Sequence, residues 1–196
     1  MRNPEATKEA ILKKSGVLFN TIGYKATSIS QITDATGFTK GAIYRHFNSK
    51  DELERETLTH LSSILFDKLG TAIKAEKNAR GKLMTILHFF ESYATNPPVK
   101  GGCPLLNAAI EADDAHPGLR KGALKMLSIL RESIVAILQN GIDHKQIKPG
   151  IDKDAYASII IAMLEGGIMM SKLEGNNEDI RIVIKHLKSQ LDQILL

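Results

Sequence analysis

The sequence predicts an all-α fold, in which a three-helix N-terminal unit precedes a larger helical bundle, giving about nine helices in total. Three observations favour this fold. Apolar residues recur at helical spacing along most of the chain, and we find no convincing strand. Helix start and stop signals surround a glycine near residue 37, and Pro- and Gly-rich breakers separate the later segments.

Length and composition are those of an ordinary soluble protein with a real core. The 196 residues are 43% apolar and 24% charged. No stretch approaches the roughly 20 apolar residues of a membrane span, and the N-terminus is too polar for a signal peptide. The single cysteine, Cys103, excludes an internal disulfide and is interpreted as a packed loop residue, with a redox sensor as the alternative. We therefore expect a cytoplasmic protein without membrane contact.

The first elements are an N-terminal helix and a pair of short helices. A helix is predicted from Thr7 to Ile22, where Gly23 stops it. Ser28 can cap the next helix, and Gln31 is placed to return the bond, as in a capping box. Gly37 then supplies the left-handed residue that ends this helix.

The second short helix follows immediately and presents an exposed polar face. Thr39 caps it, while Ile43 and Phe47 lie four residues apart and face inward. The outward residues are Lys40, Gly41, Tyr44 and Arg45. Two short helices, a glycine-centred turn and outward hydrogen-bond donors are typical of a helix-turn-helix, which places its second helix in the major groove of DNA.

Positive charge gathers at the same end of the chain. Residues 1–50 hold eight Lys/Arg against three acidic residues, a net of +5, whereas the remaining 18 basic and 19 acidic residues give −1. A solvated basic surface is the alternative explanation. Together with the motif, the charge favours binding to a phosphate backbone.

The order of residues here resembles the DNA-binding region of the TetR family of transcriptional regulators, of the AcrR-like kind. The match consists of Thr-Ser-x-x-x-Ile from Thr27, followed by Gly-Phe-Thr-Lys-Gly-Ala-Ile-Tyr-Arg-His-Phe-Asn-Ser-Lys-Asp-Glu-Leu from Gly37. It runs from about Ala10 to Leu53. The junction near Asn48 is the expected domain boundary, with a helix-turn-helix DNA-binding domain at 1–48 and a helical ligand-binding and dimerisation domain at 49–196.

The start of the second short helix carries the candidates for base contact. Lys40 can donate to guanine O6 and N7. Gly41 and Ala42 leave room for the backbone to approach, and Ala42 can touch a thymine methyl. Thr39 can donate to a phosphate besides capping. Arg45 is left open between a base contact, a phosphate contact and the surface.

Other positions take their expected roles from the resemblance. It implies contacts to the phosphate backbone at Ser28, Ser30, Tyr44, His46 and Lys50. Partial core burial is the alternative for Tyr44, and an ordinary surface histidine is the alternative for His46. Phosphate contacts position a protein without encoding sequence, so these residues do not reveal the operator.

The remaining helices are predicted from periodicity and breakers. A second capping box, Ser49 to Glu52, opens a long fourth helix that runs toward Gly70. Asp152 is the predicted cap of the eighth helix. The other predicted helices are Ala79–Ala94, Leu105–Asp113, Leu119–Gly141, the eighth helix up to Leu173, and Glu178–Leu195.

The last two helices are predicted to join two copies of the chain. One carries a stripe of small residues, Ala155, Ser158, Ala162 and Gly166, and the other a near-heptad stripe, Ile180, Ile184, Leu187, Leu191 and Ile194. Plain core packing is the alternative. Pairing of these helices would give a two-fold symmetric dimer that suits a palindromic operator, and the TetR family is similar in dimerising through its last two helices.

The larger half is predicted to bind a small-molecule effector between its helices. Ordinary core is the alternative for such residues, and it is the resemblance that favours a ligand. The candidates are Phe89, Phe90, Tyr93, Leu106, Asn107, Ile110, Met126, Met163, Gly167 and Met170. His88 and His116 are interpreted as surface or satisfied core residues.

The function expected from all this is a sequence-specific transcriptional regulator, a repressor released from double-stranded DNA by an effector. An activator and an effector-independent architectural dimer are the alternatives. We find no local signature of a catalytic triad, a phosphate-binding loop or a metal site, so no enzyme activity, cofactor or metal is expected.

Overall fold

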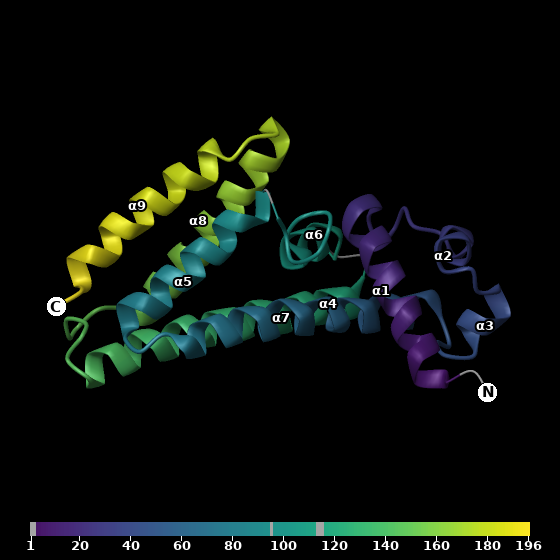
Figure 1. Cartoon of the computed structure of the whole chain (residues 1–196), viewed down its shortest axis with the longest axis horizontal. Coiled ribbons are helices and arrows are strands. Elements are labelled where there is room, and N and C mark those ends of the chain that lie inside the picture. The colour runs from purple at the N-terminus through teal and green to yellow at the C-terminus, as the bar shows by residue number, and fades with distance from the viewer. Residues whose placement is uncertain (1–2, 95, 113–115) are drawn as a thin grey trace. The chain divides into compact units, whose positions relative to one another are not determined.

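The computed structural model of the chain is all-α, as predicted (Figure 1), and describes residues 3–94, 96–112 and 116–196. Within these residues there are nine α-helices and one 3₁₀ turn, and the extended pairing is an isolated antiparallel bridge between Ile147 and Leu195. The elements are α1 (Pro4–Ile22), α2 (Ile29–Thr36), α3 (Lys40–Tyr44), α4 (Lys50–Ala75), α5 (Ala79–Glu91), η1 (Ser92–Ala94), α6 (Pro104–Glu111), α7 (Pro117–Asp143), α8 (Lys153–Glu174) and α9 (Glu178–Ile194). Most predicted ends lie within a turn of those observed, and the predicted end at Asp113 falls outside the described residues.

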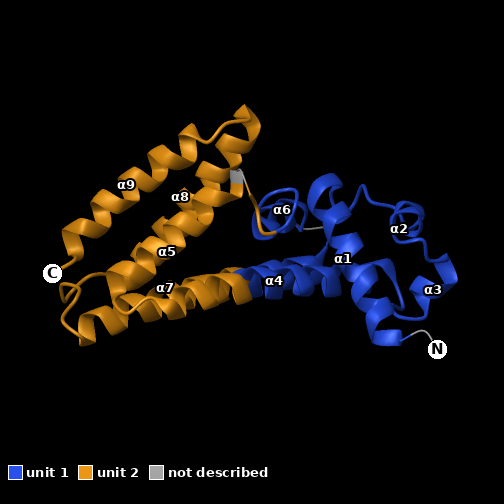
Figure 2. Cartoon of the chain, in the orientation of Figure 1, with its two compact units in different colours: residues 1–65, 99–126 blue, residues 66–98, 127–196 orange. Residues whose placement is uncertain are grey.

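The chain forms two compact units (Figure 2). One contains residues 1–65 and 99–126, and the other contains residues 66–98 and 127–196. The first unit therefore joins α1, α2 and α3 with α6 and with the starts of α4 and α7. The first unit is therefore larger than the predicted DNA-binding domain, residues 1–48, because α6 and parts of α4 and α7 pack with the N-terminal helices. The functional boundary between residues 48 and 49 stays a prediction.

The first unit has an apolar core of large side chains beneath the helix-turn-helix. The rings of Phe19 and Tyr24 stack with their centroids 4.9 Å apart, which anchors the end of α1 and the loop after it. Nine core residues are each at most 2% exposed: Ile11, Phe19, Tyr24, Ile32, Ile43, Phe47, Leu53, Leu58 and Leu61. Buried apolar residues thus fix α1, α2, α3 and α4 against one another.

In the second unit, α8 and α9 are joined by a short turn and pack against each other, and the sides that face each other are buried. The predicted apolar stripe of α9 is at most 6% exposed and packs against α8 and α5. Ser171 Oγ accepts the Ile180 N–H at 3.0 Å, joining the end of α8 to the start of α9. The stripe is therefore part of the core of a single chain. Periodicity predicted that this face of α9 would be apolar, but it could not predict which helix would pack against it.

The opposite face of α8 is exposed. Its small residues Ala155, Ser158 and Ala162 are exposed, and Leu173 on the same face is 80% exposed. α8 is long and apolar enough to pass a length-and-composition test for a membrane span, a test that core helices also pass. Its inner face packs against α9, as a core helix requires.

Candidate DNA-binding surface

Both predicted ends of α2 are confirmed. Ser28 Oγ accepts the Gln31 N–H at 3.2 Å, and Gln31 Oε1 accepts the Ser28 N–H at 2.8 Å, which completes the capping box. Gly37 has a φ of 71°, and its N–H donates to Thr33 O at 2.8 Å. Because glycine adopts this left-handed conformation without steric cost, the chain turns sharply from α2 into α3.

The short helix α3 presents the face that was predicted. Thr39 Oγ1 accepts the Ala42 N–H at 3.2 Å, which confirms the cap, and Ile43 and Phe47 are each 1% exposed. A Cβ built on Gly41 would meet no atom within 4 Å, so the backbone there is open to a partner. Lys40 Nζ lies 5.9 Å from the centre of the Tyr44 ring, which supports the lysine side chain over α3.

All ten predicted DNA-binding residues lie in the first unit. Seven of them are exposed: Ser28, Ser30, Thr39, Lys40, Gly41, Tyr44 and Arg45. The other three, Ala42, His46 and Lys50, are half-buried. The exposed residues come from the start of α2 and from α3, so they form one polar surface around the turn, with Tyr44 38% exposed rather than in the core.

A hollow beside α3 joins this surface to the start of α1. Its volume is about 380 Å³, and it is lined by Pro4, Thr7, Phe38, Ala42, Arg45 and His46. Arg45 and His46 thus border a recess next to the recognition helix. Such a recess can receive a sugar or phosphate group when α3 lies in the major groove.

Lys50 is half-buried, and its ammonium is bound by groups of the protein itself. Its ammonium donates to Tyr24 O at 2.7 Å and lies 3.1 Å from Glu54 Oε1, a carboxylate that is 3% exposed. The predicted phosphate contact of Lys50 receives no support from this geometry, because the charge already has two partners. The second predicted capping box is half present: Ser49 Oγ accepts the Glu52 N–H, but Glu52 Oε2 accepts the N–H of Asn48, one residue before the predicted donor.

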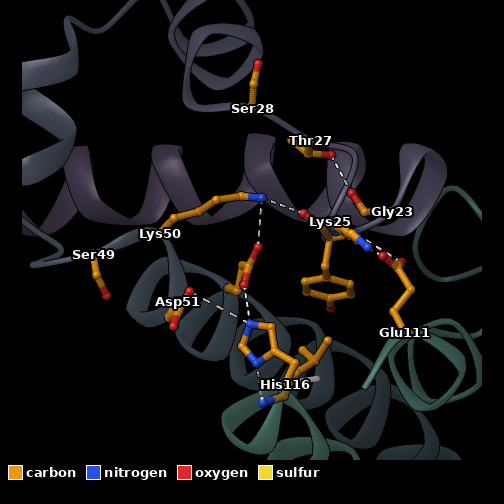
Figure 3. A network of polar contacts seen from close by, with 12 residues as sticks. Gly23, Lys25, Thr27, Ser28, Ser49, Lys50, Asp51, Glu111 and His116 are labelled. Atoms are coloured by element: carbon orange, nitrogen blue, oxygen red, sulfur yellow. Dashed lines mark hydrogen bonds and ion pairs between the residues drawn. The ribbon is translucent and has the colours of Figure 1, made fainter. Parts of the chain in front are cut away.

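The loop between α1 and α2 is held from two sides (Figure 3). Glu111, the last residue of α6, accepts the N–H groups of Tyr24 and Lys25, one on each carboxylate oxygen, both at 3.0 Å. On the other side of the Tyr24 residue, Lys50 of α4 binds its carbonyl. Burial, followed by the charges of Glu111 and Glu54, raises the pKa of the Tyr24 phenol.

A second contact joins α4 to α7. His116 Nε2 lies 2.5 Å from Glu54 Oε2 and 4.0 Å from Asp51 Oδ1, while His116 Nδ1 accepts the Leu119 N–H at 3.2 Å. Because Nδ1 accepts, the ring proton lies on Nε2 and points to Glu54. Asp51, Glu54 and His116 gather three potential metal ligands within 4.8 Å. An Nε2 that carries a proton has no lone pair for a metal, so the geometry favours a hydrogen bond from His116 to Glu54, which also forms an ion pair with Lys50.

The loop before α6, together with Asn107 of α6, also holds the end of α1. The Asn20 side-chain amide donates to Lys100 O and Gly102 O, both at 2.9 Å. The Asn107 amide in turn donates to Asn20 Oδ1 at 2.9 Å and to Gly101 O at 3.2 Å. Sequence reasoning missed this connection and the Glu111 contact, because each joins segments at least 80 positions apart and leaves no periodic signal.

The ten predicted ligand residues are divided between the units. Leu106, Asn107, Ile110 and Met126 belong to the first unit, and Phe89, Phe90, Tyr93, Met163, Gly167 and Met170 belong to the second. In the second unit, the rings of Phe90 and Tyr93 stack at 5.4 Å, and Phe89 meets Tyr93 edge-on at 5.9 Å. This aromatic cluster is the part of the predicted pocket that the structure brings together.

Other members of that set have different surroundings. The Asn107 amide is engaged by α1 and its own loop, Ile110 is 66% exposed, and Met170 is 39% exposed. A Cβ on Gly167 would lie 2.9 Å from Ile180 Cδ1, so this glycine serves the close packing of α8 on α9. The ligand pocket therefore stays a prediction.

An exposed recognition helix, an open glycine at its start and a basic N-terminal end define a helix-turn-helix DNA-binding protein. Comparison with known proteins is more specific. Residues 11–57 match the model of the bacterial regulatory proteins of the TetR family, and residues 79–187 match a tetracyclin repressor-like C-terminal domain. The chain belongs to the TetR family and is a DNA-binding transcriptional regulator.

Solved and curated relatives resemble the chain over most of its length. The crystal structure of a TetR transcriptional regulator from Chloroflexus aurantiacus has 35% identity and a TM-score of 0.95, and the match covers 100% of this chain and 98% of that one. An uncharacterized HTH-type transcriptional regulator in the lacX 3' region of Lactococcus lactis subsp. lactis is 28% identical, with 87% and 86% covered. The HTH-type transcriptional repressor KstR2 of Mycolicibacterium smegmatis is 25% identical, with 77% and 72% covered. TetR-family regulators bind DNA operators and usually act as dimers with small-molecule effectors.

Proposed function

We propose that the chain is a repressor that binds a palindromic operator as a homodimer and is released by a small-molecule effector. The observation that carries the proposal is the surface of α3, where exposed Lys40 and Arg45 flank a backbone left open at Gly41. The name of the relative KstR2 supports repression. An activator would use the same surface, because the position of the operator decides the sign of regulation.

Roles on DNA follow from exposure. Lys40, Gly41 and Ala42 face base edges, because the first residues of a recognition helix enter the major groove deepest. Ser28, Ser30, Thr39 and Tyr44 bind the flanking phosphates, and Arg45 and His46 line the recess beside α3. Lys50 acts through the loop that it holds rather than by touching a phosphate.

The dimer is proposed to form through the exposed face of α8 together with α9. Ala155, Ala162 and Gly166 allow close approach of a second helix there, and nothing lies within 4 Å of a Cβ built on Gly166. Large apolar side chains are exposed on both helices, with Ile159 of α8 54% and Ile182 of α9 65% exposed. An exposed apolar face of this kind marks an interface, and two-fold pairing suits a palindrome.

The effector is proposed to bind beside the aromatic cluster of α5 and η1. α4 and α7 each contribute residues to both compact units, so these helices are the routes by which a bound ligand acts on the DNA-binding surface. Release requires that the ligand bind the low-affinity conformer more tightly than the DNA-bound one.

Selection of bound sequences from a random DNA pool tests the proposal. We expect a palindrome with half-sites about one helical turn apart, bound by a dimer about 10³-fold more tightly than random DNA. Compounds that bind the protein are then titrated against the complex. Equal affinity for random and selected DNA would instead indicate an architectural protein, and retention of the operator with every bound compound would contradict release by an effector.

A further inference from the structure

The contact between Glu111 and the loop after α1 has the geometry of a built anion seat. Two consecutive backbone N–H groups, those of Tyr24 and Lys25, converge on one carboxylate, each at 3.0 Å from a different oxygen. Successive amides that converge in this way form a concave site for anions. Here the anion is the side chain of α6, so the helix is attached to the loop by two charge-assisted hydrogen bonds.

Gly23 provides the space for this carboxylate. Its φ is 106°, and a Cβ built on it would lie 2.9 Å from Glu111 Oε1 and 3.1 Å from Glu111 Oε2. The backbone conformation and the missing side chain therefore both suit the seat. Residues with a Cβ rarely adopt a positive φ of this kind, so glycine suits this position, where the carboxylate binds.

The seat is connected to the first turn of α2 through short, local bonds. Gly23 O accepts both the Thr27 N–H at 3.1 Å and the Thr27 hydroxyl at 2.6 Å, and Thr27 is 1% exposed. Ser28, the cap of α2, follows directly. Lys50 closes the loop from the other side by donating to Tyr24 O. Local hydrogen bonds therefore connect the loop residues that Glu111 binds to the first turn of α2.

We propose that Glu111 is a positioning residue for operator recognition. Its carboxylate fixes the loop after α1, and through it α2 and α3, on helix α6. A helix-turn-helix held in this way is pre-organised for one half-site geometry, whereas a loosened one loses affinity for that geometry and tolerates others. This inference rests on the proposed function as a dimer on a two-fold operator.

The test uses the full-length protein and the operator selected from the random pool. Affinity is measured for that operator and for versions with one base pair added to or removed from the spacer. The variant Glu111→Gln keeps the shape but places an amide NH₂ against one of the two N–H donors. The control Glu9→Gln makes the same charge change at an exposed position of α1 in the same unit.

We expect Glu111→Gln to bind the native spacing about tenfold more weakly, as the loss of a hydrogen bond to a charged group predicts, and the altered spacings about as well as the wild type does. Discrimination between spacings then falls about tenfold, while Glu9→Gln retains it. Simple destabilisation would lower the active fraction and weaken binding to all three DNAs by one factor, which would overturn a positioning role. Full retention of spacing discrimination in Glu111→Gln would overturn it as well. A wild-type protein without any spacing preference would overturn the proposed function itself.

Discussion

His116 joins the first turn of α7 to α4 by both nitrogens of its ring. Nε2 lies 2.5 Å from Glu54 Oε2, and Nδ1 accepts the Leu119 N–H at 3.2 Å. Glu54 in turn pairs with Lys50, whose ammonium binds the loop before α2. One histidine, one carboxylate and one lysine therefore connect α7 to the DNA-binding helices within the first unit.

Removing His116 is expected to destabilise the protein. In His116→Ala the buried Glu54 keeps only its lysine partner among the contacts described, and α7 loses a bond to its first turn. Loss of a hydrogen bond to a charged group costs about 1.5–3 kcal/mol in the free energy of unfolding, measured by urea denaturation. The exposed His88 offers a control, since His88→Ala is expected to change stability by less than about 0.5 kcal/mol. Equal effects of the two variants would contradict the network.

Lys50 and Lys40 are expected to differ in how their removal affects DNA binding. Lys50→Ala should weaken operator binding while leaving its salt dependence almost unchanged, because the ammonium binds Tyr24 O and Glu54. Lys40→Ala should relax sequence preference at one base pair by about 1–3 kcal/mol. Anisotropy titrations over a range of salt concentrations, on matched and mismatched operators, measure both. If Lys50→Ala instead reduced the slope of log affinity against log salt concentration by about one unit, Lys50 would contact a phosphate, as the sequence predicted.

Tyr24→Phe is expected to preserve or increase stability. The Tyr24 hydroxyl is buried without a hydrogen-bond partner among the described residues, so the variant removes a desolvated polar group, a gain of up to about 1 kcal/mol. Burial also raises the pKa of the phenol above its usual value of 10.0. The unfolded chain therefore loses the proton first, and wild-type stability falls as the pH rises above about 10. The variant should lose less stability between pH 9 and about pH 11 in chemical denaturation, and an equal loss would contradict the burial.

The exposed face of α8 is expected to hold the dimer together. Leu173→Glu places a charge at a position that is 80% exposed in the single chain and that the proposed interface would bury. The control is Leu124→Glu on α7, where the leucine is 59% exposed. Sedimentation should show a monomer for the first variant and a dimer for the second. A dimeric Leu173→Glu would move the interface elsewhere.

Neighbouring glycines of α8 provide a matched pair. Alanine at Gly167 must displace Ile180 and Val183, since its Cβ would lie 2.9 Å and 3.2 Å from their side chains, whereas a Cβ at Gly166 meets nothing within 4 Å. Both gain about 1 kcal/mol of helix propensity. The free energy of unfolding is measured at protein concentrations low enough to give monomers. It should be about 1 kcal/mol higher for Gly166→Ala than for Gly167→Ala. The reverse order would contradict the packing of α8 on α9.

Local rules predicted the helix-turn-helix in detail because its determinants lie three or four residues apart. The Ser28–Gln31 capping box, the left-handed Gly37 and the cap at Thr39 all follow from neighbours in the sequence, as does the cap of α8 at Asp152 outside this motif. Such bonds form wherever the backbone is helical, so the residue types alone reveal them.

Contacts between distant segments could not be predicted in the same way. Burial of the α9 stripe depends on which helix packs against it, and the engagement of Lys50 depends on a carbonyl 26 residues away. The seat for Glu111 requires a backbone conformation at Gly23, and that glycine was assigned only the role of ending a helix. The type of a side chain limits which groups it can contact, but it does not determine which of them it contacts in the fold.

Asn107 and Glu111 hold the end of α1 and the loop after it, and their helix α6 lies outside the residues proposed to contact DNA. Chimeric regulators made by exchanging residues 1–48 for those of a relative, in order to retarget an effector response to a new promoter, would separate these two residues from their partners. A chimera that also carries matching side chains at positions 107 and 111 would preserve the bonds between the donor's helix-turn-helix domain and α6 of the recipient.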